Sequence, residues 1–153
     1  MSVATLAPPK SSTKELQLVT FNVGPLHLGL SIEHIQEINR NLDVTLVPHA
    51  PPCVRGVINL RGNVVTVVDL RTVWGLTPGE ITRQSRNLVV KSRGEQIGLW
   101  VDRILDTMII NSDDIEPAPA NVDGVDGRFF EGVYTTQNAV VVVVRLEELL
   151  AMT

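Results

Sequence analysis

Residues Gly56 to Trp74, GVINLRGNVVTVVDLRTVW, align without a gap over Gly132 to Leu150, GVYTTQNAVVVVVRLEELL, at an offset of 76 (132 − 56). In each copy, two runs rich in β-branched residues flank a short polar turn, which is the pattern of a β-hairpin. The identical positions are Gly56, Val57, Val64, Val65, Val67, Val68 and Leu70. This stretch therefore predicts a mainly β chain with an internal duplication.

A second pair of similar segments extends the duplication to most of the chain. Leu18 to Ile38 resembles Leu88 to Ile109, with Gly29 matching Gly98 at an offset of 69 (98 − 29). The second copy thus carries about seven extra residues, which we place between 111 and 131. A repeat of this length is too long for a solenoid. We expect two similar β-units packed together, from half-repeats of approximately 15–80 and 85–153, after a flexible tail at 1–14.

The composition limits the classes of function. The chain has 153 residues, 44% of them hydrophobic but only 4% aromatic, so Val, Leu and Ile must build the core. A net charge of −4 without a basic stripe argues against binding to nucleic acid or to an anionic membrane surface. The longest apolar run, Ala139 to Val144, is far too short to insert into a membrane. We expect a cytoplasmic protein that is monomeric when free.

The residues that usually carry chemistry are not arranged for it. His27, His34 and His49 do not have the spacing of metal ligands. The single cysteine, Cys53, is expected to be a small buried apolar residue. The acidic stretch at 113–116 lacks the spacing of a calcium loop. The sequence therefore predicts no enzyme, no cofactor and no metal.

Three local patterns predict individual elements. Ile32, Ile35 and Ile38 lie three residues apart, which favours one or two helical turns. The run Val140 to Val144 is typical of a strand buried on both faces, with an exposed edge strand as the alternative. Val144 to Met152 has the apolar spacing of a C-terminal amphipathic helix.

Glu37 and Arg61 differ between the two copies. If the offsets hold, the second copy has Asp106 in place of Glu37 and Gln137 in place of Arg61. A duplicated fold needs its core in both copies, whereas a binding site is needed in only one. Arg61 can therefore be a functional residue, or an exposed turn residue in a weak salt bridge.

The stretch GVINLRGNVVTVVDLRTVWGL, from Gly56 to Leu76, resembles CheW-type chemotaxis coupling proteins. Further matching pieces occur in the family's order, and the resemblance covers Glu15 to Met152. Thr66 departs from the pattern, since many members have proline there. The other matching pieces are Ile35 to Ile38, Val47 to Pro51, Ile97 to Asp102, Ile115 to Pro119 and Glu131 to Val133.

The resemblance implies both a fold and a role. The fold would be two packed five-stranded SH3/OB-like β-barrels around a shared core, with short helices and a C-terminal helix. The role would be a non-catalytic adaptor that joins the cytoplasmic tip of methyl-accepting chemoreceptors to the regulatory domain of a CheA-type histidine kinase. Its partners would recruit it to membrane receptor arrays.

Other roles stay open. The same adaptor function could serve a pathway controlling pili, gliding or a second messenger. The chain could also be a detached regulatory domain of the kinase, although its end at Thr153 favours a free-standing protein. A small-molecule-binding β-barrel is the alternative from a different class.

The resemblance also implies a site. The family's characteristic acid and arginine fall on Glu37 and Arg61. We expect them to border a receptor-binding groove at the seam between the barrels. The residues expected around them are Ile32, Ile35, Gly56, Val57 and Asn59.

Overall fold

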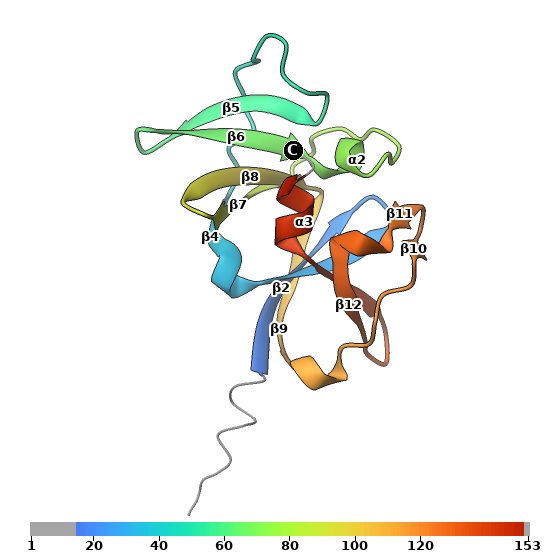
Figure 1. Ribbon diagram of the computed structural model, residues 1–153. Helices are drawn as coiled ribbons and strands as arrows, with labels where there is room; N and C mark the ends of the chain where they lie inside the picture. The colour runs from blue at the N-terminus through green and yellow to red at the C-terminus, as the bar shows by residue number, and fades with distance from the viewer. Residues whose placement is uncertain (1–14, 152–153) are drawn as a thin grey trace, which may run out of the picture.

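The computed structural model describes residues 15–151 (Figure 1). The expected tail at 1–14 and the last two residues of the second half-repeat lie outside the described residues. The strands are β2 (Glu15–Val23), β3 (Leu26–Ser31), β4 (Ile35–Asn39), β5 (Val54–Leu60), β6 (Asn63–Asp69), β7 (Arg86–Ser92), β8 (Glu95–Val101), β9 (Arg103–Asn111), β10 (Asn121–Val122), β11 (Val125–Asp126), β12 (Phe130–Thr135) and β13 (Val140–Val144). The helices are the 3-10 turns η1 (Ile32–His34), η2 (Ser112–Asp114) and η3 (Gly127–Phe129), with α2 (Leu70–Val73) and α3 (Leu146–Ala151).

The strands form two five-stranded sheets, which confirms the predicted mainly β, double-barrel fold. One sheet has the order β12-β13-β3-β2-β9 and is called barrel 1; the other has the order β4-β7-β8-β6-β5 and is called barrel 2. The barrels lie one above the other in Figure 1, with α3 beside the junction. The small β10–β11 hairpin lies within the segment where the sequence placed its insertion.

The two barrels have the same order of equivalent strands. The sequence equivalents of β12, β13, β3, β2 and β9 are β5, β6, β8, β7 and β4. In that order they are the strands of barrel 2 read from its β5 edge. The register agrees, because Val143 lies opposite Gly29 in barrel 1 and Val67 lies opposite Gly98 in barrel 2. The β2–β3 hairpin therefore belongs to barrel 1 and the β7–β8 hairpin to barrel 2 (Figure 1). Each barrel contains strands from both half-repeats, so the sheets do not coincide with 15–80 and 85–153.

An equivalent bridge closes each sheet into a barrel. In barrel 2 the N–H groups of Thr45 and Val57 donate to each other's carbonyl oxygens at 2.8 and 2.9 Å. In barrel 1 Glu116 and Val133 make the same pair of bonds at 2.8 Å. A glycine precedes each closing residue on the barrel's edge strand, next to a β-bulge. At Gly56, with φ of 147°, a Cβ atom would overlap the Thr45 carbonyl oxygen.

Three apolar clusters form the core of residues 15–151. The largest lies between the barrels and includes Phe21 and Leu30 from barrel 1 and Leu88 and Leu99 from barrel 2. A smaller cluster around Val67 fills barrel 2, and another around Val143 fills barrel 1. Alternate residues of each strand thus serve the shared core and a barrel interior, as the pleat requires.

The three local predictions had different outcomes. The C-terminal helix is confirmed as α3 (Leu146–Ala151). In the valine run the residues from Val141 to Val144 are at most 4% exposed, so burial on both faces is confirmed, although Val140 is 51% exposed. The predicted helical turns are confirmed only at η1, because Ile35 and Ile38 belong to β4. A bulge between Ile35 and Glu37 shifts the register there. The isoleucine spacing therefore reflects an irregular strand and not a helix.

A polar contact joins the barrels beside the shared core. The guanidinium of Arg71, on α2, forms an ion pair with the carboxylate of Asp102, between β8 and β9. Asp102 also accepts a hydrogen bond at 2.8 Å from the N–H of Gly24, in the β2–β3 turn. Elements of both barrels therefore meet at this one carboxylate.

Candidate functional site

Glu37 and Arg61 lie on opposite edges of barrel 2 and meet where the barrel closes. Glu37 is on the edge strand β4, and Arg61 begins the turn between β5 and β6. The guanidinium of Arg61 donates to the carboxylate of Glu37 and forms an ion pair with it. The structure therefore brings together the two residues that the sequence singled out, although they are 24 positions apart.

The turn geometry positions the arginine. Arg61 has φ of 51° and Gly62 has φ of 88°, as a two-residue hairpin loop with positive φ at both positions requires. The side chain of Asn59 accepts a hydrogen bond at 2.9 Å from the N–H of Gly62. The loop is thereby held, while the Arg61 side chain stays 75% exposed.

Glu37 is more enclosed than its partner and has a second donor. Its side chain is 22% exposed, and the side-chain amide of Asn39 donates to it at 3.1 Å. The hydrogen bond from Arg61, and next that from Asn39, lower the pKa of Glu37 below its usual value of 4.5. The site is thus a fixed carboxylate at the edge of a barrel, with a solvent-facing guanidinium beside it.

The equivalent position in barrel 1 cannot form this pair. Asp106 corresponds to Glu37 and lies on β9, but Gln137 replaces Arg61 and has no charge. The backbone carbonyl of Asp106 instead accepts a hydrogen bond at 2.6 Å from Thr20. The Glu37–Arg61 site is therefore a feature of barrel 2.

The other residues of the predicted site are spread over η1, β4 and β5. Ile32, in η1, is 41% exposed, and Ile35 packs against the shared core. A depression of about 350 Å³ includes Ile32, Leu16 and Ser112. Gly56 and Val57 take part in closing barrel 2 against Thr45.

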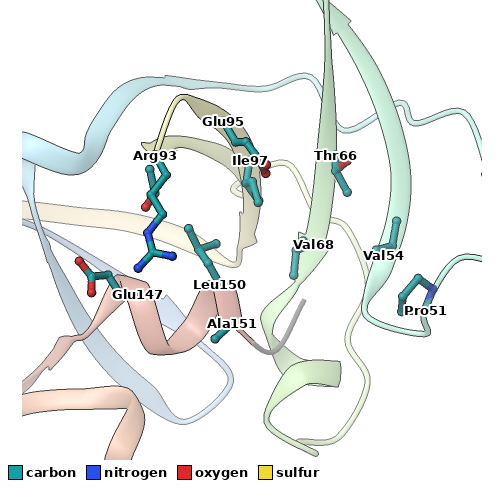
Figure 2. A pocket seen from close by; sticks show the side chains of 11 residues that line it. Pro51, Val54, Thr66, Val68, Arg93, Glu95, Ile97, Glu147, Leu150 and Ala151 are labelled. Atoms are coloured by element: carbon teal, nitrogen blue, oxygen red, sulfur yellow. The ribbon is translucent and has the colours of Figure 1, made fainter.

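A larger groove of about 500 Å³ lies between α3 and the strands β5, β6 and β8 of barrel 2 (Figure 2). Val54, Val68, Ile97 and Leu150 supply an apolar lining. Figure 2 shows the Arg93 side chain reaching from the β7–β8 turn toward α3. None of the residues predicted for the receptor site lines this groove. Its walls come from α3 and from strands that are distant from α3 in sequence, so the sequence pattern did not indicate it.

The residues that might carry chemistry lie apart. Cys53 is buried in the shared core, as predicted. Within residues 15–151, His, Cys, Asp and Glu side chains do not gather in threes around a possible metal position. No helix in the described part of the chain is long and apolar enough to cross a membrane.

Two barrels of equivalent strand order, with exchanged hairpins, define a double β-barrel module of the SH3-like class. The family model for the CheW-like domain matches residues 17–153. The chain belongs to this CheW-like family.

Individual relatives agree with the family match. The chain is 32% identical to the chemotaxis protein CheW of Helicobacter pylori over 88% of this chain and 81% of that protein. It is 28% identical to a probable chemotaxis protein CheW of Rhizobium etli over 90% of this chain and 88% of that protein. The crystal structure of the scaffolding protein TtCheW from Thermoanaerobacter tengcongensis matches with a TM-score of 0.80 and 30% identity, over 88% of this chain and 86% of that chain.

Proposed function

We propose that this chain is a non-catalytic coupling adaptor of a chemosensory pathway. It would hold the cytoplasmic tip of a methyl-accepting chemoreceptor and the regulatory domain of a CheA-type histidine kinase in a fixed relative position. A conformational change in the receptor then alters the activity of the kinase. Two observations together carry this proposal. The chain has the CheW-like fold, and barrel 2 has the Glu37–Arg61 pair that its counterpart in barrel 1 lacks.

The receptor would bind beside this pair. A chemoreceptor tip presents a helical surface, and helices dock through apolar side chains at regular spacing. Ile32 and Ile35 supply apolar surface near Glu37 on the same chain segment, and Ile32 is exposed enough to be contacted. The Glu37 carboxylate and the Arg61 guanidinium, beside this apolar surface, would fix the orientation of the receptor helix, as charged groups at interfaces commonly do.

Gly56, Val57 and Asn59 would support the site from beneath. Val57 closes the barrel against Thr45, and Gly56 permits the two backbones to approach. Asn59 holds the turn that carries Arg61. We propose that these three residues act through the position of Arg61 and need not touch the receptor.

The partners would also decide where the protein acts. An adaptor of this kind works in the cytoplasm and reaches the membrane only through the receptor. The acidic net charge of −4 supports this, because an anionic lipid surface would repel it.

Reversing the charge of Arg61 tests the site. In Arg61→Glu the new carboxylate faces Glu37, so we predict that the affinity for a purified receptor cytoplasmic fragment falls at least tenfold, as expected when a central charged contact is lost. Titration calorimetry would measure the affinity, and circular dichroism would verify the fold.

Arg93→Glu is the matched control. Arg93 and Gly94 form another Arg-Gly turn with positive φ at both positions, 52° and 82°, on a different hairpin of barrel 2. This variant makes the same change of charge and should bind the receptor fragment as the unchanged protein does. Equal losses in the two variants, or no loss in either, would show that the pair is not the receptor site.

A pull-down from lysate of the source organism tests the wider proposal. Purified protein should recover a CheA-type kinase together with methyl-accepting receptors, and the identity of the receptors would define the pathway. Recovery of neither partner, from a lysate shown to contain both, would contradict the adaptor function.

A further inference from the structure

Asn87 is a fully buried polar residue in the interior of barrel 2. It lies on β7 with 0% exposure, and its side chain covers Gly98 on the neighbouring strand β8. The equivalent residue in barrel 1 is Leu18, which covers Gly29 in the same way. One barrel therefore fills this interior position with leucine, and the other fills it with an amide.

The amide leaves one of its own polar atoms unsatisfied inside the barrel. Its Oδ1 has no hydrogen-bond partner among residues 15–151. An unsatisfied buried acceptor costs free energy, whereas an apolar group of similar size would not. Leucine would avoid this cost, as it does in barrel 1, so the reason for an amide is to be sought in the hydrogen bond that its nitrogen makes.

The donor side of the Asn87 amide leads to the surface site. Its Nδ2 donates at 3.3 Å to the carbonyl oxygen of Asn41, in the segment that follows β4. The N–H of Asn41 donates at 2.9 Å to the side-chain oxygen of Asn39. Asn39 in turn donates at 3.1 Å to Glu37, which receives Arg61 on its other oxygen. A continuous chain of hydrogen bonds therefore connects the barrel interior with the exposed ion pair.

We propose that Asn87 and Asn39 are positioning residues for Glu37. The Asn87 side chain bonds the segment after β4 to the barrel interior. Asn39 is hydrogen-bonded to that segment and holds the Glu37 carboxylate in place. We call this series, Asn87 to the Asn41 backbone to Asn39 to Glu37, the asparagine relay. Its importance for receptor binding rests on the proposed function, whereas its effect on Glu37 does not.

The chemistry of each member fits this role. A carboxylate on an edge strand can rotate about its side-chain torsions, and a single exposed ion pair fixes it weakly. A second donor on the other oxygen restricts that rotation. Asn39 provides this donor, and its own oxygen accepts the hydrogen bond from the Asn41 N–H, which orients the amide. The lowered pKa of Glu37, which Asn39 helps to cause, agrees with a donor directed at the ionised form.

Asn87→Leu tests the relay, because it copies the residue of barrel 1 and removes the unsatisfied oxygen. The variant removes the unsatisfied oxygen but also takes away the donor to the Asn41 carbonyl, so its melting temperature should stay close to that of the unchanged protein. We nevertheless expect three changes. The Asn41 amide should exchange with solvent several-fold faster, the pKa of Glu37 measured by carboxyl NMR titration should rise toward its usual value, and affinity for a receptor cytoplasmic fragment should fall about fivefold.

Two further variants keep the test decisive. Asn87→Ala removes the same donor without adding atoms and should cause the same three changes if the leucine variant does not fold. Asn39→Asp keeps the oxygen that accepts from the Asn41 N–H but loses the donor to Glu37, so it should raise the pKa of Glu37 and leave the Asn41 amide protected.

Val141→Ala is the structural control. Val141 lies 1% exposed in barrel 1, away from the relay, so this variant should melt earlier and leave the pKa of Glu37 and the receptor affinity unchanged. Unchanged Asn41 exchange and an unchanged Glu37 pKa in folded Asn87→Leu or Asn87→Ala would overturn the relay, whatever the receptor does. Failure of Arg61→Glu to weaken receptor binding would instead overturn the proposed function.

Discussion

At the scale of single residues, the stability of the fold does not account for the Glu37–Arg61 pair, which agrees with the receptor site proposed above. Its arginine is 75% exposed, and solvent-exposed ion pairs of this kind contribute little to folding. Barrel 1 has the same strand order and closure without the pair, so the barrel architecture does not depend on it. The residues around the pair hold the carboxylate and the turn in place.

The lowered pKa of Glu37 gives a prediction about pH. A carboxyl with a lower pKa in the folded state contributes stability above its unfolded pKa and loses it as the pH falls through the folded pKa. The difference in unfolding free energy between the unchanged protein and Glu37→Gln should therefore be constant from about pH 7 to 5 and shrink below pH 4.5. Urea titrations at several pH values would measure it.

Salt provides the control for this pH dependence. Because both side chains reach solvent, 1 M salt should reduce the difference between the two proteins. A difference that grows as the pH falls would contradict the assignment of the pair.

Part of the site could be predicted from sequence. Arg61 stood out because the second copy has Gln137 in its place while keeping the surrounding valines, and the family resemblance paired it with Glu37. Asn87 did not stand out, because its burial over Gly98 and its bond to Asn41 depend on strand pairing between distant segments. The groove between α3 and barrel 2 escaped prediction for the same physical reason.

At the scale of elements, the edge hairpin with its bulge is the unit that closes each barrel. In β5 and β12 the bulge falls at Gly56 and Gly132, and the next residue bridges to a segment beyond the opposite edge strand. The valine-rich alternation predicted these hairpins correctly, because period-2 burial is a local property. The helical reading of Ile35 and Ile38 was wrong, since the β4 bulge alters the spacing of apolar residues in the strand.

Adding a methyl group at Gly56 should disturb this closure. Gly56→Ala requires a strained φ of 147° and forces Cβ against the Thr45 carbonyl, so we expect a loss of about 3 kcal/mol of unfolding free energy. Urea denaturation would measure the loss. Gly75→Ala is the control, because Gly75 has φ of 70° but no neighbour within 4 Å, and it should cost only about 1 kcal/mol. Equal losses in the two variants would contradict the role of the close approach.

At the scale of the whole molecule, the exchanged hairpins make the two barrels interdependent. Each barrel lacks two of its central strands unless the other half of the chain supplies them. The shared core and the Arg71–Asp102 contact then hold the barrels in one relative orientation. The sequence revealed the duplication but not the exchange of hairpins between the barrels. The β2–β3 and β7–β8 hairpins have similar apolar patterns, so the pattern does not tell which barrel each hairpin joins.

This interdependence predicts how the halves behave alone. Fragments 15–80 and 85–151 should each lack a cooperative thermal transition, since each barrel's core would be incomplete. Mixed at equal concentration, they should regain the strand signal in circular dichroism and a common melting transition. A cooperative transition in either fragment alone would show that a half-repeat folds independently.

The most direct measurement is kinase autophosphorylation in a mixture of purified receptor cytoplasmic assemblies and CheA-type kinase, with and without this protein. We predict that the protein raises autophosphorylation only when receptor is present, and that Arg61→Glu largely abolishes the rise while Arg93→Glu preserves it. Activation that does not require receptor, or no activation by a folded sample, would contradict a coupling function.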